Sequence, residues 1–569
     1  MRHKHIALDG TIKLQLEVSR NRLIFVGVVV LLCYTALVIR LFDIGLDGSE
    51  GNRELSVPGI ARLELMRGEI RDRNGVMLST NLITSSLYAN PKEILDPKEA
   101  ADSLHDLFPS IPYDELLEKL SSGKTFVWIK RKLPPKEQYA VNNLGLPGLY
   151  FKREEKRIYP HAELVSHIMG VVGTDGHGLS GVEKQFDTQL LSGRTSFEPV
   201  NLSIDVRVQD VLRSEIASAI HQFRAIGGAG LVMDAHTGEV LGMVSLPDFD
   251  PNNPARIAPD ATFNRASFGV YEMGSSFKTF TLAQALDQGI TQLSDSYDAT
   301  KPLVFAKHTI RDFHPEGKWL TVPEIFVHSS NIGTARIAMN IGEQRQKEFL
   351  QKIGLLDPAV LEIPERGTPM YPSHWRKINS MTIAFGHGIA VTPLHLVSAI
   401  SAMINGGVYH TPTLLKRSQE SFEKDPGKQV IKPATSRIMQ KLFRLVVTKG
   451  TGEKADVPGY LVGGKTGTAE KLINGHYNPD ARMSSFVGAF PMNNPKYVVF
   501  VMIDEPKPTK ETFGYATGGW TAAPAVSHII ARIAPMLGVA PVNVPEEPKQ
   551  QMAAKKIEDD VTQHVLEDN

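Results

Sequence analysis

The longest uninterrupted apolar run of the chain lies close to its N-terminus. Residues 23–39 contain no charge and would span roughly 26 Å as a helix, the low end for a membrane crossing. A cleaved signal peptide would have a shorter apolar core and a cleavage site of small residues after it, and neither feature is present. The pattern therefore predicts an uncleaved transmembrane helix over residues 23–41.

The charges that flank this run predict its orientation. Five basic residues precede it, and only Arg40 and Arg53 follow within the next twenty positions. An excess of positive charge marks the cytoplasmic side. We therefore expect residues 1–22 to form a cytoplasmic tail and the rest of the chain to lie outside the plasma membrane.

Two segments flank residues 205–540, the region with the strongest hydrophobic periodicity. Residues 43–200 alternate short strand-like runs with polar turns, and Asn74-Gly75 is a strong signal for a two-residue hairpin turn. These residues predict a separate domain of mixed secondary structure. Residues 541–569 are charged and poor in apolar side chains, so we expect a disordered tail.

Residues 205–540 read as one α+β domain. Helical spacing runs through residues 203–223, and residues 231–234 and 239–246 flank a turn at 235–238. Much later come three more apolar strand candidates and a closing helix, over residues 460–469, 484–490, 497–504 and 525–537. The early and late strands together predict a five-stranded antiparallel sheet, flanked by helices and interrupted by a large helical insert.

Composition narrows the possible functions. The chain has 569 residues with 62 basic and 62 acidic side chains, so no net charge favours nucleic acid. Its single cysteine, Cys33, excludes an intrachain disulfide, and it lies within the apolar run. The histidines show no zinc-ligand spacing, and we expect neither a metal nor a cofactor.

Three short motifs carry the candidate chemistry. Ser275 and Lys278 form S-x-x-K, Ser329 and Asn331 form S-x-N, and residues 465–467 read K-T-G. Each motif alone is weak, because helix caps, solvated lysines and ordinary turns produce the same letters. The three together, in this order and in fitting contexts, indicate a serine nucleophile that forms an acyl-enzyme.

The spacing explains the residue types. A serine hydroxyl needs a base to become nucleophilic, and Lys278 lies one helical turn after Ser275. The start of a helix favours a developing anion. A neighbouring cation would favour the neutral form of Lys278, and Lys465 is the candidate for that cation.

The other two motifs supply candidates for proton transfer and substrate binding. Ser329 would pass a proton to the leaving amine, and Asn331 would bind the amide of the acyl chain. On a predicted edge strand, Thr466 and Thr468 would bind a substrate carboxylate, and Gly467 would let a peptide backbone approach. The backbone amides of Ser275 and Thr468 are the candidate oxyanion donors.

Further segments carry a resemblance to a known family. Residues 67–75 read RGEIRDRNG, residues 181–187 read GVEKQFD, and residues 384–388 read AFGHG. With the three motifs, they make the chain resemble the class B penicillin-binding proteins, in particular their division-specific branch. The resemblance implies a pedestal over residues 43–200 and a transpeptidase domain over residues 205–540. We expect His387 to be structural, because the sequence indicates no carboxylate to orient it.

The resemblance also implies a setting. A division-specific transpeptidase would cross-link peptidoglycan stem peptides at the septum of the inner membrane and would react with β-lactams. Its implied partners are the glycosyltransferase FtsW, FtsN and the FtsQ–FtsL–FtsB complex. An elongation-specific transpeptidase and a β-lactam-sensing receptor remain alternatives. A class A β-lactamase is disfavoured, because no E-x-x-x-N motif lies between Asn331 and Lys465.

Overall fold

The computed structural model describes residues 20–21, 24–38, 67–191, 198–473 and 475–542. The chain divides into two units, residues 1–64 and 65–569. In the first unit, residues 24–38 form a helix with exposed side chains. Over the described ranges, no helix is both long enough and apolar enough to cross a membrane. Residues 23 and 39–41 of the predicted span, nearly all of the predicted cytoplasmic tail and residues 543–569 of the predicted C-terminal tail lie outside the described residues.

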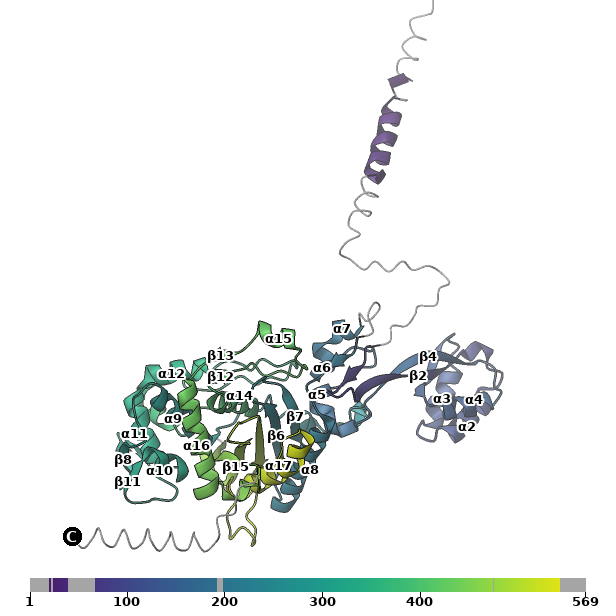
Figure 1. Cartoon of the computed structure of the whole chain (residues 1–569). Coiled ribbons are helices and arrows are strands. Elements are labelled where there is room, and N and C mark those ends of the chain that lie inside the picture. Colours follow the sequence, from purple (N-terminus) through teal and green to yellow (C-terminus); the bar gives the residue numbers. More distant parts are fainter. Residues whose placement is uncertain (1–19, 22–23, 39–66, 192–197, 474, 543–569) are drawn as a thin grey trace, which may run out of the picture. The chain divides into compact units, whose positions relative to one another are not determined.

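The first part of the second unit is built on a long strand, β2 (Met77–Ala89). It pairs antiparallel with β4 (Leu149–Ile158) along its length and with β3 (Val127–Leu133) toward its end (Figure 1). One face of this sheet packs on three helices, α2 (Pro97–Leu107), α3 (Tyr113–Leu120) and α4 (Pro135–Asn142). Residues of the region between 87 and 151 thus share a hydrophobic core of their own. The short elements that complete it are β1 (Ile70–Arg71), α5 (Ser166–Met169), α6 (Gly181–Gln185), α7 (Asp187–Leu191) and β5 (Val200–Asn201).

Asn74-Gly75 lies in the connection between β1 and β2, which pair antiparallel as the sequence predicts. The connection is longer than the predicted two-residue turn. The Asp72 carboxylate accepts hydrogen bonds from the backbone N–H of Asn74 and of Val76, both at 2.8 Å. These bonds hold an open loop, with Gly75 at a φ of +86°.

A buried cluster of charges ties the ends of this domain together. Glu183 is fully buried and accepts from Arg67 at 2.6 Å and from Arg157 at 2.7 Å. Arg67 also pairs with Asp187 at 2.6 Å. Both oxygens of Glu183 are thus paired with arginines, which offsets the loss of hydration on burial.

Replacing Arg67 with alanine is expected to destabilise this domain by about 3–5 kcal/mol, because Glu183 would keep a buried charge with one partner fewer. Hydrogen exchange of peptides from β2 and β4 would measure the loss. Arg71→Ala is the matched control, since the Arg71–Glu69 pair is exposed and should contribute less than about 1 kcal/mol. Equal effects of the two substitutions would contradict the role of burial.

The second part of the unit contains the predicted five-stranded antiparallel sheet. The strands are ordered β14-β15-β16-β6-β7, and every neighbouring pair is antiparallel. The first two strands in sequence, β6 and β7, thus join three strands from the other end of the domain. Their bounds are β6 (Gly227–Asp234), β7 (Val240–Leu246), β14 (Gly463–Ile473), β15 (His476–Phe490) and β16 (Tyr497–Asp504).

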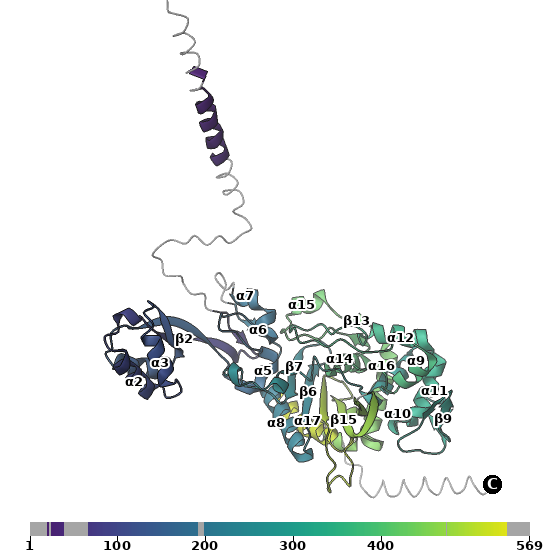
Figure 2. The same ribbon diagram turned by 180° about the vertical axis from the view of Figure 1, so that it is seen from behind.

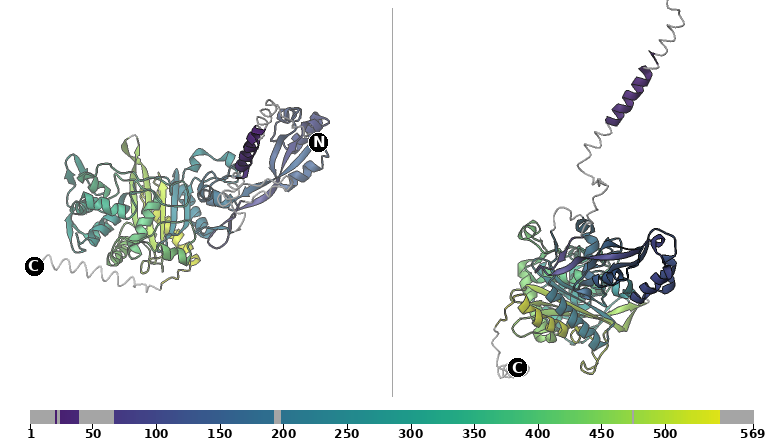
Figure 3. Two further views of the ribbon diagram at one scale, coloured as in Figure 1. Left: turned by 90° about the horizontal axis from the view of Figure 1, so that it is seen from above. Right: turned by 90° about the vertical axis from the view of Figure 1, so that its right-hand side faces the viewer.

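The sheet separates two hydrophobic cores. Along β6, Leu231 and Met233 face one core and Val232 faces the other. Helices α8 (Val206–Phe223) and α17 (Ala522–Met536) cover the second face (Figure 2). Helices α9 (Lys278–Asp287), α14 (Pro393–Ile404) and α16 (Pro433–Lys449) lie on the first face, within the helical insert. The view from above in Figure 3 shows the strands between these layers.

The insert between β7 and β14 is largely helical, as predicted. Besides α9, α14 and α16 it contains α10 (Val322–Val327), α11 (Asn331–Ile341), α12 (Glu343–Lys352), α13 (Lys377–Ile383) and α15 (Gln419–Lys424). The insert also contains three two-stranded antiparallel sheets, made by β8 (Ser296–Asp298) with β11 (Trp319–Thr321), β9 (Leu303–Phe305) with β10 (His308–Ile310), and β12 (Val408–Tyr409) with β13 (Lys428–Gln429).

The late strands differ from their predicted bounds. β14 begins three residues later than predicted, at Gly463, and continues to Ile473. β15 begins at His476 rather than at residue 484. The added part is a polar hairpin, in which a register irregularity follows Glu470. It has no alternating apolar face, so hydrophobic periodicity gave no signal for it.

Candidate active site

Ser275 and Lys278 lie at the start of α9. Ser275 is in a single 3-10 turn, Gly274–Phe277, that leads into the helix at Lys278. The Nζ atom of Lys278 lies 3.1 Å from Oγ of Ser275. Lys278 is fully buried, whereas Ser275 is partly exposed. The one-turn spacing thus produces the predicted contact between nucleophile and base.

Ser329 lies in the turn between α10 and α11 and has a φ of +60°. Its Oγ is 3.0 Å from Nζ of Lys278, and its carbonyl oxygen accepts a further hydrogen bond from the same amine. Ser329 does not cap α11. That place belongs to Ser330, whose Oγ accepts from the N–H of Gly333 at 3.0 Å.

Lys465 reaches the same hydroxyl from the opposite side. It lies on β14, which is an edge strand as predicted, and its Nζ is 3.0 Å from Oγ of Ser329. Its side chain is fully buried. One serine hydroxyl therefore bridges two buried amines that come from motifs far apart in the sequence.

Burial decides the charge of these amines. Loss of hydration and the neighbouring Lys465 charge hold the pKa of Lys278 well below its usual range. Burial also lowers the pKa of Lys465. In its neutral form, Lys278 has two N–H groups, which reach Ser329, and one lone pair, which remains for the hydroxyl proton of Ser275.

The K-T-G strand packs directly against the nucleophile turn. A Cβ atom at Gly274, whose φ is +51°, would lie 2.5 Å from the carbonyl oxygen of Thr468. The backbone of Thr468 thus passes directly beside that of Gly274, the residue before Ser275. A Cβ at Gly467 would lie 2.4 Å from Oγ of Ser485. Internal packing therefore already requires a glycine there.

The threonine hydroxyls of this strand have internal partners. Oγ1 of Thr466 is 2.8 Å from Oγ1 of Thr451, and Oγ1 of Thr468 accepts from the N–H of Gly518 at 3.2 Å. These contacts fix the rotamers of both side chains. Neither Thr451 nor Gly518 belongs to a motif, so no sequence pattern predicts these contacts.

The S-x-N segment is likewise held by residues that the sequence analysis missed. Nδ2 of Asn331 donates to the carbonyl oxygen of Arg311 at 2.9 Å. The next residue, Asp312, accepts from Oγ of Ser330 at 2.8 Å. Arg311 and Asp312 precede Asn331 by about twenty positions, and no local pattern links them to it.

His387 lies at the same site, and no carboxylate among the described residues forms a hydrogen bond or ion pair with it. Its ring stacks on Tyr477, with centroids 5.7 Å apart, and Oη of Tyr477 donates to Glu272 at 3.1 Å. Burial and the charge of Lys278 lower the pKa of His387 to about 4, so the imidazole is neutral. This environment suits the structural role that we expect for His387.

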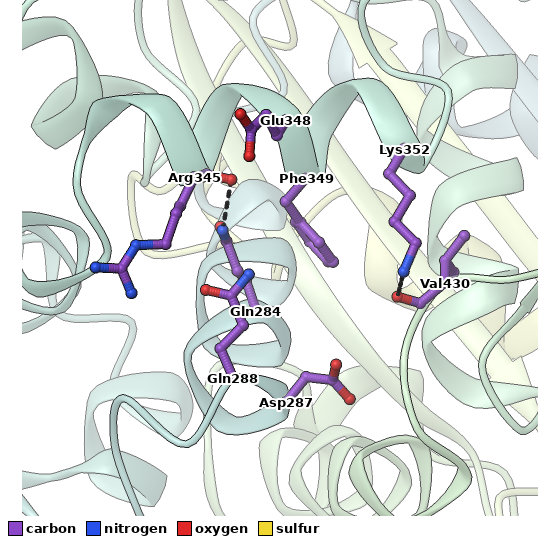
Figure 4. Close-up of a pocket in the computed structure, with 8 residues that line it drawn as sticks. All are labelled: Gln284, Asp287, Gln288, Arg345, Glu348, Phe349, Lys352 and Val430. Carbon is purple, nitrogen blue, oxygen red and sulfur yellow. Dashed lines mark hydrogen bonds between the residues drawn. The ribbon is translucent and has the colours of Figure 1, made fainter.

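A separate pocket lies at the far end of α9 from Ser275. It has a volume of about 180 Å³ between α9 and α12, and amides and charged side chains line it (Figure 4). Two hydrogen bonds close its walls, from Gln284 to the carbonyl of Arg345 and from Lys352 to the carbonyl of Val430. Within the part of the chain that the structure describes, no cluster of His, Cys, Asp or Glu could hold a metal ion.

Two family models match most of the chain. Residues 228–531 match the penicillin-binding protein transpeptidase domain, and residues 63–218 match the penicillin-binding protein dimerisation domain. The matched boundary near residue 220 lies later than the expected end of the pedestal at residue 200.

Curated relatives and solved structures agree with these matches. The chain is 40% identical over 487 residues to a protein of Caulobacter vibrioides named as a probable peptidoglycan D,D-transpeptidase FtsI, covering 84% of this chain and 82% of that protein. It is 32% identical to the probable peptidoglycan D,D-transpeptidase PenA of Neisseria meningitidis, covering 92% and 94% of the two chains. The fold matches penicillin-binding protein 3 of Mycobacterium tuberculosis, solved with aztreonam, with a TM-score of 0.66, 23% identity and coverage of 85% and 98%.

Proposed function

The chain belongs to the class B penicillin-binding proteins, which join a dimerisation domain to a transpeptidase domain, and from this we propose that it is a serine peptidoglycan D,D-transpeptidase of cell division. The observation that carries the activity is the convergence of Lys278 and Lys465 on Ser329, beside the hydroxyl of Ser275. Two buried amines beside two serine hydroxyls are suited to transferring protons, as catalysis of acyl transfer requires. A protein that only binds a ligand would not need this arrangement.

The proposed reaction begins with acylation. Neutral Lys278 takes the proton of Ser275 as Oγ attacks the carbonyl carbon of the penultimate D-alanine in a donor stem peptide. The backbone amides of Ser275 and Thr468 stabilise the oxyanion. The bond to the terminal D-alanine then breaks, and Ser329 delivers a proton to its amine.

Transfer completes the cycle. An amine of a neighbouring stem peptide attacks the ester carbonyl and loses its proton to Lys278 and Ser329. The bond to Oγ of Ser275 breaks, Oγ regains a proton from Lys278, and the new amide is the cross-link. Asn331 binds the amide of the donor chain. Lys465, Thr466, Gly467 and Thr468 hold the terminal carboxylate and the peptide backbone along the edge of β14.

β-Lactams are expected to acylate Ser275 by the same reaction, because Ser275 can attack the carbonyl of their strained amide as it attacks that of the donor peptide. The solved relative was crystallised with aztreonam, which fits this expectation. After acylation the ring fragment stays attached, so the acceptor amine cannot enter. The ester is therefore expected to persist.

The setting of the reaction is also a proposal. We place the chain in the inner membrane through the helix predicted over residues 23–41, with the N-terminus in the cytoplasm and the catalytic domain in the periplasm. The proposed domains are the pedestal at 43–200, the transpeptidase domain at 205–540 and a tail at 541–569. The proposed partners are FtsW, FtsN and the FtsQ–FtsL–FtsB complex, with FtsW supplying new glycan strands.

Depletion of the chain in its own bacterium would test this function. We expect filaments without septa and fewer peptide cross-links, because septal glycan would remain unlinked. Wild-type protein should restore division, and Ser275→Ala should not. Microscopy and muropeptide analysis would measure both effects.

Other outcomes would point to the alternatives. Cells that swell or round up would indicate an elongation-specific transpeptidase. Rescue by Ser275→Ala would contradict catalysis and favour a scaffold or a β-lactam-sensing receptor.

A further inference from the structure

One buried carboxylate near the site belongs to none of the three motifs. Asp312 lies in the connection between β10 and β11 and is 9% exposed. A buried carboxylate is stable only where hydrogen bonds or cations replace its hydration. Its partners therefore indicate what it holds in place.

Both oxygens of Asp312 bind the S-x-N segment. Oδ2 accepts from Oγ of Ser330 at 2.8 Å, and Oδ1 accepts from the N–H of Ile332 at 2.9 Å. The preceding residue, Arg311, accepts from Asn331 through its carbonyl oxygen at 2.9 Å. Two consecutive residues thus hold all three residues that follow Ser329.

This contact matters because Ser329 is in a demanding conformation. Its φ of +60° lies in the left-handed region, which is energetically unfavourable for any residue that has a Cβ atom. Ser330 turns the chain into α11, and its hydroxyl both donates to Asp312 and accepts from Gly333. A loosened Ser330 would let Ser329 relax and move its hydroxyl away from the two amines.

We propose that Asp312 is a positioning residue for acyl transfer, whose carboxylate clamps residues 330–332 and so keeps Ser329 between Lys278 and Lys465. The inference rests on the proposed function. In this role Asp312 does not contact the substrate. It holds the groups that transfer the proton in place and adds a negative charge near them.

The charge of Asp312 adds a measurable effect. Three titratable groups face Lys278, namely Lys465 from β14, Asp312 from the β10–β11 connection and His387 from the loop before α14. Burial and Lys465 lower the pKa of Lys278, while the negative charge of Asp312 raises it. Removing that charge would lower the pKa further, so Lys278 would stay neutral to a lower pH.

The test is the rate of acylation by benzylpenicillin as a function of pH, measured on the full-length chain and two variants. Asp312→Asn should slow acylation at least ~10-fold, because an amide cannot accept both hydrogen bonds, and should move the acid limb of the profile to lower pH. Ser330→Ala should also slow acylation, but should leave the acid limb in place because Asp312 keeps its charge.

Asp295→Asn is the matched control. Asp295 likewise accepts from a hydroxyl, of Thr291 at 3.0 Å, and from a backbone N–H, of Gln292 at 2.8 Å, but beyond the far end of α9. Asp295→Asn should leave the acylation rate and the pH profile unchanged.

Wild-type rates in both Asp312→Asn and Ser330→Ala would overturn the inference. An acid limb that does not shift in a folded Asp312→Asn protein would also overturn it. If Asp312→Asn does not fold, a wild-type rate in Ser330→Ala alone overturns the clamp, and a slowed rate supports it. Absence of acylation in the wild-type chain would instead overturn the proposed function.

Discussion

Ser275→Ala is expected to abolish the covalent adduct with benzylpenicillin, while the protein remains folded. Among the described residues, the Ser275 hydroxyl has a hydrogen bond to Lys278, and after the substitution the buried amine of Lys278 keeps its two bonds to Ser329. Without this oxygen no ester can form. Mass spectrometry of the intact chain should show one added drug mass on the wild type and none on the variant.

The neighbouring Ser276 is the matched control, because both hydroxyls fall within one proteolytic fragment. Ser276 is fully buried, and its Oγ has no hydrogen-bond partner among the described residues. Ser276→Ala should therefore keep the adduct. Labelling that persists in Ser275→Ala would overturn the assignment of the nucleophile. Rapid release of hydrolysed drug by the wild type would favour a β-lactamase.

Lys278→Ala should lower the acylation rate by at least ~10²-fold, the typical effect of removing a general base. Among the described residues, only this amine forms a hydrogen bond with Oγ of Ser275. The measurement is the second-order rate constant for benzylpenicillin, at a pH where the wild type reacts fully.

Lys278→Met separates the lost base from the lost packing. The lysine side chain is fully buried, so alanine would also leave a cavity beside Ser329. Methionine fills most of that volume but has no amine. Equal losses in both variants would assign the effect to the base. A near-wild-type rate in either would remove Lys278 from the mechanism.

The sheet could be predicted because its strands are apolar on both faces. β6 and β16 are covered by helices on each side, and their buried residues form continuous apolar runs in the sequence. The polar end of the β14–β15 hairpin has no such covering, and its pairing follows from the strands it extends. The local hydrophobic pattern therefore predicts the buried part of a strand more accurately than it predicts the ends of the strand.

The site divides in a similar way. Ser275 and Lys278 could be paired from sequence, because one helical turn joins them. Asp312 could not, since only the folded insert brings its loop to Ser330. Helix capping is the alternative interpretation of the S-x-N motif, and the structure assigns the cap of α11 to Ser330, which lies between the two motif residues. Residues that hold a catalytic group are harder to predict than the group itself.

The order of strands in the sheet has a consequence for how the enzyme matures. β6 pairs with β16, about 260 residues later in the chain, and closing a loop of that length costs about 5 kcal/mol of chain entropy. Such distant pairing forms slowly and only after the C-terminal strands have been synthesised. Lys465 lies on β14 of this same sheet and reaches Ser329, so a chain that is still being translated lacks the assembled group of Lys278, Ser329 and Lys465. Reactivity with substrate and with antibiotic is thus expected only when the whole domain has folded.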